Sequence, residues 1–230
     1  MADPEAALER DRPTIQVDFY FCEGKDERKT VSEAKAILLL VDVWTRYTHV
    51  EPMEKKSARA VGEAISRFAG MVGHVGMVEL AGDNEHVLVA GMELCKSVRA
   101  KHGFPTTISL NKSYSKSRTG VAERTIQTVR NLQKTLVAQL EHEIQCKLPS
   151  GHPVLYWSAV HASWLYNRYH THSTIKITPF QAVHGRPYRG RITCFGQKVF
   201  GLMARGNKYR PMWKQGVWLG RDGTSEEDYS

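Results

Sequence analysis

Cysteine is scarce in this chain of 230 residues: there are four, and none of them forms a CxxC pair. This scarcity argues against both a disulfide framework and a cysteine-based zinc knuckle. His161, His170 and His172 have no nearby cysteine to complete a zinc ligand set, so we interpret them as histidines lining a helix end.

Long hydrophobic runs are also missing. The longest apolar run, Ala36–Val41, is the size of a strand, whereas a membrane helix needs about 20 residues. The N-terminal stretch MADPEAALERDRP is charged and lacks the apolar core of a signal peptide. We therefore expect an intracellular protein with no membrane partner.

Acidic residues are absent from one long segment. From Met1 to Glu143 there are 20 Lys and Arg residues against 20 Asp and Glu residues, but from Ile144 to Arg221 there are 12 basic residues and no acidic ones. Solubility alone is an alternative explanation, although a surface selected for solubility normally mixes both signs. A polyanion such as DNA is the natural partner, because each neutralised phosphate releases counterions.

Hydrophobic periodicity predicts a layered α/β domain with a mixed sheet. Apolar patterns predict three successive strands, at Thr14–Phe21, Ala36–Val43 and Tyr47–Met53. The elements predicted after them are a helix capped by Ser57, a strand at Met77–Leu80, a helix at Val87–Ala100, a strand at Thr106–Leu110, a long helix from Ala122 to Leu140 and a helix at Tyr156–Tyr169.

Composition divides the chain into four parts. Residues 1–12 form a loose leader, 13–185 the core domain, 186–221 a small basic β-rich appendage, and 222–230 an acidic tail. The appendage is predicted from the short strand-like runs ITCFGQKVF and GVWLGR, which are rich in Gly, Arg and aromatic residues.

Three carboxylates stand at costly or strategic positions. Asp18 interrupts an apolar and aromatic strand, where an unpaired carboxylate is disfavoured. Asp83 follows a short strand, at the edge where α/β sheets hold their sites. Glu123 opens the long helix, where it also complements the helix dipole. Each acid alone has an ordinary structural explanation, but the trio together indicates a functional site.

The order Asp18, Asp83, Glu123, in the contexts IQVDFYF, GDNEH and TGVAERTIQTVRN, resembles the DDE catalytic core of retroviral and long-terminal-repeat retrotransposon integrases. The run WSAVHASWLYNRYHTHSTIKITPFQAVHGRPY is similar to the family's later helix and its TPF-and-glycine segment. The tail CFGQKVF … GVWLGR is similar to the region after the core in copia-type elements. The resemblance covers residues 13–221.

This resemblance implies an RNase H-like fold in which Asp18, Asp83 and Glu123 are the catalytic residues and bind two Mg²⁺ or Mn²⁺ ions. Oxygen ligands suit these cations, and two-metal sites stabilise the attacking and leaving oxygens of phosphodiester substitution. The implied reactions are DNA 3′-end processing and strand transfer. The implied partners are element-end DNA, target DNA and further copies of the chain, acting in the nucleus.

Three groups of residues are candidates for DNA binding. Gln127 and Arg130 follow Glu123 by four and seven positions on one helix ridge, and match positions where the family contacts element-end DNA; a solvated helix face is the alternative. The loop before that helix and the appendage contribute basic and aromatic candidates, namely Lys112, Tyr114, Lys116, Arg118, Arg186, Arg189 and Arg191.

The sequence departs from the family pattern in three ways. The 39 residues between Asp83 and Glu123 exceed the usual spacing, Glu85 stands where a glycine is common, and no zinc module precedes the core, which indicates a fragment or a degenerate copy. Two other functions therefore remain open, a catalytically degenerate DNA-binding remnant and an RNase H-like nuclease. Asp42 is the rival for the first carboxylate, but it matches the family's second-strand or turn acid.

Overall fold

A five-stranded mixed sheet forms the centre of the computed structural model, which describes residues 12–21, 36–110, 120–202 and 213–221. The strand order is β3-β2-β1-β4-β5; β1, β2 and β3 are antiparallel, and β4 and β5 run parallel to β1. The strands span Thr14–Phe21 (β1), Ala36–Asp42 (β2), Thr48–Pro52 (β3), Val78–Gly82 (β4) and Thr106–Leu110 (β5). The predicted mixed sheet is confirmed.

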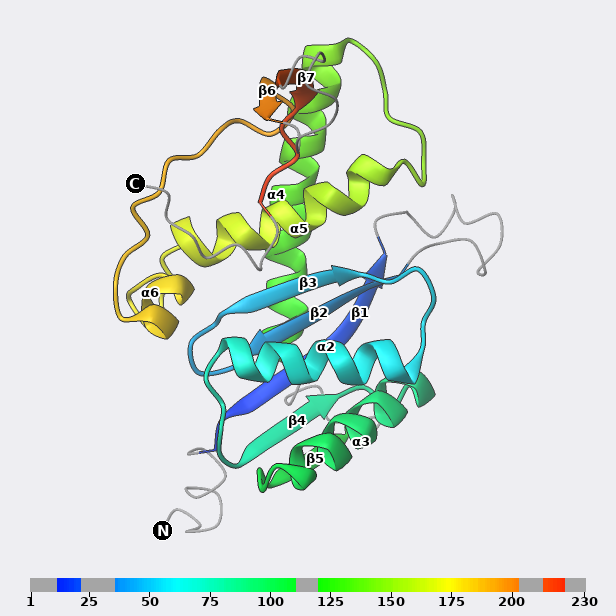
Figure 1. Ribbon diagram of the computed structural model, residues 1–230, viewed down its shortest axis with the longest axis vertical. Coiled ribbons are helices and arrows are strands. Elements are labelled where there is room, and N and C mark those ends of the chain that lie inside the picture. Colours follow the sequence, from blue (N-terminus) through cyan, green and yellow to red (C-terminus); the bar gives the residue numbers. More distant parts are fainter. Residues whose placement is uncertain (1–11, 22–35, 111–119, 203–212, 222–230) are drawn as a thin grey trace.

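Helices cover both faces of this sheet (Figure 1). Leu38 and Leu40 of β2 pack with α2 (Ala58–Met71) and α3 (His86–Lys101), whereas Leu39 and Val41 pack with the helices of the opposite face. Those helices are α4 (Gly120–Ile144) and α5 (Pro153–Tyr169). Every residue of β2 is buried because both of its faces are covered, which explains its uninterrupted apolar sequence.

Side-chain caps fix the ends of several helices. The hydroxyl of Ser57 accepts a hydrogen bond from Ala60 N (3.2 Å), which confirms the predicted start of α2. The TPF-and-glycine motif folds into a short helix, α6 (Pro179–His184), which the hydrophobic pattern did not predict. Thr178 caps it and Gly185 ends it in the left-handed conformation at φ 70°, so this motif is a complete set of helix boundary signals.

The edge strand β3 is covered by α5. The Asn167 side chain donates to Thr48 O (2.7 Å) and accepts from Thr48 N (2.9 Å), replacing the hydrogen bonds that a further strand would make. Among the described residues, no helix combines the length and apolarity that crossing a membrane requires.

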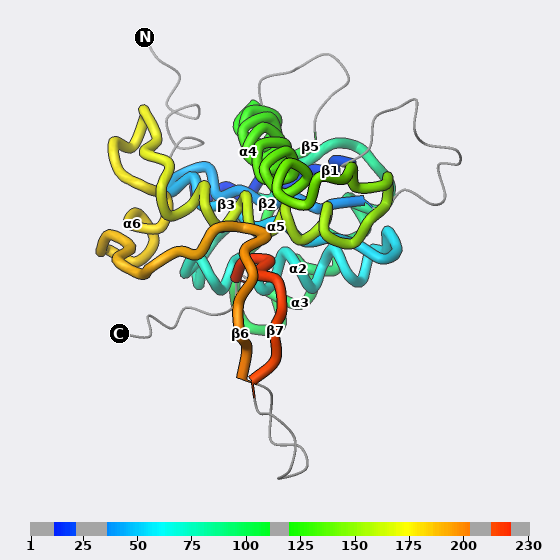
Figure 2. Tube along the Cα trace, turned by 90° about the horizontal axis from the view of Figure 1, so that it is seen from above, coloured from blue at the N-terminus to red at the C-terminus, as the bar shows by residue number. Residues whose placement is uncertain are grey.

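The C-terminal region forms an isolated hairpin of β6 (Lys198–Leu202) and β7 (Trp213–Val217), which projects away from the sheet (Figure 2). Only part of the predicted strand runs is extended, because Ile192–Gln197 forms no strand and β7 ends at Val217. The acidic tail and nearly all of the leader lie outside the described residues.

Candidate active site

Asp18 and Asp83 lie side by side at one end of the parallel strand pair. The register of β1 and β4 pairs Val17 with Gly82, so the next residue of each chain segment is one of the two aspartates. Neighbouring strands are about 4.8 Å apart, which brings the backbones of these two residues close together. A side chain at Gly82 would place its Cβ 3.0 Å from Val17 O, so glycine suits this close approach.

Glu123 lies in the first turn of α4, and a hydrogen bond ties the start of this helix to β1. The buried side chain of Gln16 accepts from Ala122 N (2.8 Å). Gln16 and Asp18 are two positions apart on the strand, so their side chains leave the same face of the sheet. The start of α4 is therefore tethered to the strand face from which Asp18 projects. Sequence reasoning missed Gln16, although a polar residue within an apolar strand was an available signal.

Electrostatics show that these carboxylates share one neighbourhood. The pKa of Asp18 is raised to about 6, mainly by burial and then by the negative charges of Asp83, Glu123 and Glu85, against the opposing effect of a hydrogen bond from Phe19 N (2.7 Å). Glu85, noticed in the sequence only as a departure from the family pattern, thus belongs to the same acidic environment.

Lys56 adds a cation at the edge of this environment. Its ammonium group lies 2.8 Å from Glu85 Oε1 and 4.3 Å from the centre of the Phe19 ring. Lys56 comes from the loop before α2, 29 positions from Glu85, and no local pattern linked the two residues in the sequence. The positive charge of Lys56 therefore partly compensates the negative charge of Glu85.

The chemistry of the donor set fits a hard divalent cation. Carboxylate oxygens are the ligands that Mg²⁺ and Mn²⁺ favour, and like charges gathered around a partly buried aspartate are relieved by a bound cation. Within the described ranges, no three His, Cys, Asp or Glu side chains are already arranged to hold a metal ion. Mg²⁺ commonly takes only one or two carboxylates and completes its shell with water and substrate phosphate.

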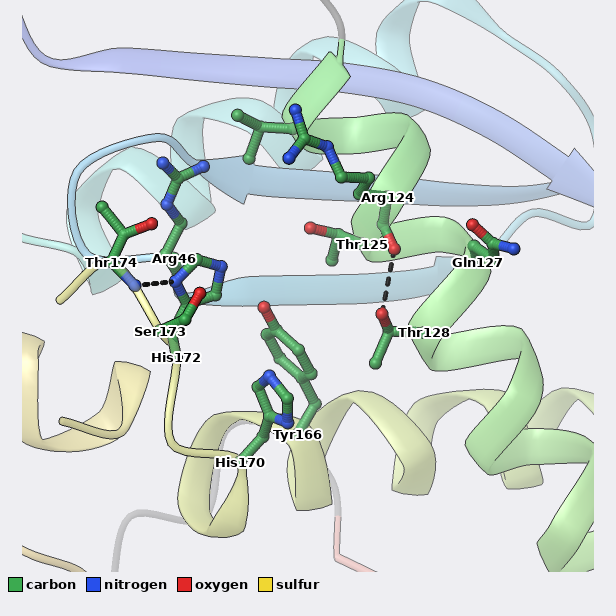
Figure 3. Close-up of a pocket in the computed structure, with 11 residues that line it drawn as sticks. Arg46, Arg124, Thr125, Gln127, Thr128, Tyr166, His170, His172, Ser173 and Thr174 are labelled. Atoms are coloured by element: carbon green, nitrogen blue, oxygen red, sulfur yellow. Dashed lines mark hydrogen bonds between the residues drawn. The ribbon is translucent and has the colours of Figure 1, made fainter. Parts of the chain in front are cut away.

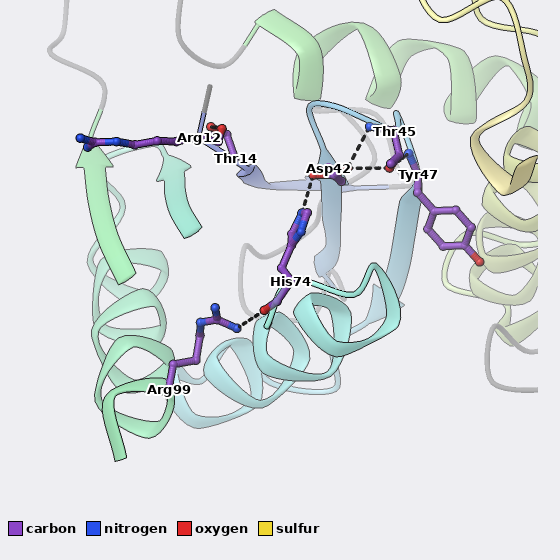
Figure 4. Close-up of polar contacts among 7 residues, drawn as sticks. All are labelled: Arg12, Thr14, Asp42, Thr45, Tyr47, His74 and Arg99. Carbon is purple, nitrogen blue, oxygen red and sulfur yellow. Dashed lines mark hydrogen bonds and ion pairs between the residues drawn. The ribbon is translucent and has the colours of Figure 1, made fainter. Parts of the chain in front are cut away.

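Asp42 lies in a network of polar contacts with His74 and Thr45 (Figure 4). Its carboxylate is fully buried, lies 2.8 Å from His74 Nε2, and accepts from Thr45 N (2.9 Å) and the Thr45 hydroxyl (2.6 Å). Burial acts to raise the pKa of Asp42, but the hydrogen bonds from His74 and Thr45 bring it below its ordinary value. Asp42 therefore stabilises the turn after β2 and is not among the charges that act on Asp18.

His161 occupies a different environment from His170 and His172. His161 lies in the middle of α5, between the rings of Trp164 and Phe195, so its interpretation as a helix-end residue was wrong. Burial lowers the pKa of His161 to about 4. His170 and His172 do follow the end of α5, with ring centres 6.2 Å apart.

The candidate DNA-binding residues differ in their exposure. Gln127 is exposed, whereas Arg130 is partly buried, donates to Phe21 O (3.3 Å) and lies 5.9 Å from the Tyr20 ring centre. The candidates exposed between α6 and β6 are Arg186, Arg189 and Arg191. The loop candidates that lie outside the described residues are Lys112, Tyr114, Lys116 and Arg118.

A mixed five-stranded sheet with helices on both faces and acids at the β1 and β4 positions defines an RNase H-like domain. Its fold is that of retroviral integrase catalytic cores. The BIV integrase core matches over 74% of this chain and 92% of its own length, at TM-score 0.50 and 14% identity. A chain of the simian T-cell lymphotropic virus intasome, solved in complex with the PP2A regulatory subunit B56 gamma, is also similar. The match covers 87% of this chain and 66% of the other, at TM-score 0.52 and 14% identity.

A further similar structure is the HTLV-2 integrase catalytic core domain, which was solved in complex with magnesium in a trimeric form. It covers 74% of this chain and 95% of its own, at TM-score 0.48 and 19% identity. No protein-family model matches the chain, and no curated protein matches it significantly. The matches to the BIV and simian T-cell lymphotropic virus structures establish the fold of an integrase core.

Proposed function

We propose that this chain is the catalytic core of a retroelement integrase, which trims the 3′ ends of element DNA and joins them to target DNA. The observation that supports the proposal is the position of Asp18 and Asp83, each directly after one member of the paired residues Val17 and Gly82 of adjacent parallel strands, with the charge of Glu123 acting on Asp18.

In this proposal Asp18, Asp83 and Glu123 hold two Mg²⁺ or Mn²⁺ ions. When bound, such ions activate the attacking oxygen and stabilise the leaving one. The chain itself supplies rigid placement, because Asp18 is fixed within a central strand and Gln16 secures the start of the helix that carries Glu123. Joining two DNA ends at one target requires several active sites, so the proposal includes a homo-oligomer, and action on chromosomal DNA places it in the nucleus.

DNA binding is assigned to the segment from Ile144 to Arg221, which has 12 basic residues and no acidic residue. Changing Arg186, Arg189 and Arg191 together to Gln tests this assignment. Each phosphate contact contributes about 0.9 to the slope of log affinity against log salt, so the triple variant should flatten the slope by about 2 to 3. An unchanged slope would assign these arginines to solubility or to another partner.

The direct test of catalysis is Glu123→Gln, which keeps the size of the side chain and removes one negative charge. Metal-dependent nicking and strand transfer should fall to background, because a two-metal site has no substitute for a missing ligand. DNA binding in EDTA should persist, because Lys and Arg provide it.

Glu143→Gln is the matched control, since it makes the same change at an exposed position near the other end of α4. It should leave activity unaltered. Equal activity of wild type and Glu123→Gln would remove Glu123 from the mechanism. A wild-type protein that binds DNA but shows no metal-dependent activity would indicate a degenerate remnant.

A further inference from the structure

A second polar site lies beside the start of α4. A pocket of about 410 Å³ opens between the first turns of α4, the end of α5 and the turn between β2 and β3 (Figure 3). Four basic side chains line it: Arg46, Arg124, His170 and His172. Among the described residues, no acidic side chain lines this pocket.

Arg46 is held toward the pocket by an unusual backbone conformation. Its φ is 62°, in the left-handed region that residues other than glycine and asparagine rarely adopt. Its Nε is buried and has no hydrogen-bond partner within the described part of the chain. The nearby carboxylate of Asp42 is already engaged by His74 and Thr45. A costly backbone conformation thus presents a cation whose Nε has no hydrogen-bond partner among the described residues.

The basic groups in the pocket act on one another. The pKa of His172 is lowered, mainly by burial and then by the charges of Arg46, His170 and Arg124. The pKa of Arg46 is likewise lowered, mainly by burial and then by the charge of Arg124, against the opposing effects of Tyr166 and Asp42. Like charges gathered in a pocket whose described lining holds no acid favour the binding of an anion.

The pocket also offers directed donors. His172 Nδ1 accepts from Thr174 N (3.2 Å), so the neutral ring carries its proton on Nε2. Arg124 Nε donates to Gly120 O (3.2 Å), an anchor that leaves its two terminal nitrogens for a ligand. Guanidinium groups match the tetrahedral oxygens of a phosphate with pairs of hydrogen bonds.

We infer that this pocket binds a phosphate group, with Arg46 and Arg124 as its principal charged donors. The phosphate is either a free anion or a phosphate of a nucleic-acid backbone, because both present the same oxygens. This assignment does not depend on catalysis by Asp18, Asp83 and Glu123, and it holds even if those carboxylates bind no metal.

The test is a titration of the full chain with inorganic phosphate in EDTA, which prevents metal-bridged phosphate at the carboxylate site. NMR of the histidine rings follows binding. Saturating phosphate should shift the His172 and His170 signals and raise the pKa of His172, because an anion stabilises the imidazolium. Signals of these two rings that stay unmoved by phosphate would overturn the assignment.

Arg46→Asn tests the role of the arginine without endangering the fold, since asparagine tolerates positive φ. The melting temperature should be equal to or above that of wild type, and phosphate affinity should fall at least about tenfold, the loss typical of a charge-assisted bidentate contact. Lys134→Gln removes one exposed positive charge from α4, the helix that carries Arg124, and should change the phosphate affinity less than about twofold. Equal losses in both variants would mean diffuse attraction and would overturn the pocket.

A short DNA duplex, also titrated in EDTA, distinguishes the two sources of phosphate. If the pocket takes a backbone phosphate, Arg46→Asn lowers the salt slope of DNA binding by about 1, whereas Lys134→Gln leaves it unchanged. If DNA binding by Arg46→Asn equals that of wild type while inorganic phosphate binding is lost, the pocket is a site for free phosphate. Both results support a phosphate pocket, and they assign its ligand.

Discussion

Asp18 and Asp42 are two aspartates on adjacent strands of one sheet, and their surroundings differ completely. Asp42 receives three hydrogen bonds, from His74 and Thr45, and its pKa is lowered. Within the described part of the chain, Asp18 receives one, from Phe19 N, and its pKa is raised to about 6 by burial and by neighbouring carboxylates. The carboxylate of Asp42, which stabilises the fold, has its hydrogen-bond acceptors occupied by protein donors. The carboxylate of Asp18 has fewer protein donors, so its oxygens can bind a cation.

The largest expected difference between the two residues is in activity. Asp18→Asn should reduce metal-dependent strand transfer by at least about a thousandfold, because it removes a ligand of both proposed ions. Asp42→Asn, assayed below its melting temperature, should retain activity within a few fold. A comparable loss of strand-transfer activity in the two variants would contradict the assignment of a catalytic role to Asp18 and a structural role to Asp42.

The stability of the folded protein should depend on Asp42 rather than on Asp18. Asp42→Asn leaves the largely buried His74 without its carboxylate, and disrupting a buried pair costs about 3 kcal/mol. For a chain of this size the melting temperature should fall by about 6 to 12 °C, as measured by circular dichroism or calorimetry. The contribution of Asp42 is fully present above pH 3.8 and is lost as the pH falls through its lowered folded pKa. A melting temperature unchanged at pH 7 would contradict its structural role.

Asp18→Asn should instead stabilise the metal-free protein at pH 7.5. Ionised Asp18 is disfavoured in the folded state, and a pKa raised from 3.8 to about 6 corresponds to a cost on the order of 2–3 kcal/mol. The cost is absent below pH 3.8, grows as the pH rises, and is complete above about pH 6. Denaturation in EDTA should therefore show a gain at pH 7.5 that disappears near pH 4. A loss of stability at pH 7.5 would contradict the account of Asp18.

The smallest expected effect is that of Thr45→Val. This change removes the hydroxyl donor to Asp42 (2.6 Å) and the acceptor for Tyr47 N (3.2 Å), and should cost about 1 kcal/mol. The Asp42–His74 pair remains, so the loss should be well below that of Asp42→Asn, and activity should be unaffected. Urea denaturation of both variants provides the comparison.

Much of the fold was predictable because its signals are local. The alternation of Thr14–Phe21 and the continuous apolar run of β2 predicted their strands, and Ser57 predicted the start of α2. The short helix α6 was missed although Thr178 and Gly185 bound it, because six residues are too few to show a helical period.

The candidate site was predictable only in part. Asp18 and Asp42 both lie in apolar strands, and periodicity alone does not separate them. The difference comes from His74, 32 positions from Asp42, and from the parallel register that sets Asp18 beside Asp83. Arg46 and His172 likewise meet only in the folded chain. Contacts between distant segments depend on packing, which no local pattern encodes.

Mn²⁺ binding measured by electron paramagnetic resonance tests the central claim most directly, because it requires neither DNA nor catalysis. The wild type, Asp18→Asn and Asp42→Asn are titrated under conditions in which all three are folded. The account predicts that Asp18→Asn weakens Mn²⁺ binding at least about tenfold, as expected for the loss of a charged ligand, and that Asp42→Asn binds like wild type. Mn²⁺ binding unaffected by Asp18→Asn, or weakened as much by Asp42→Asn, would contradict it.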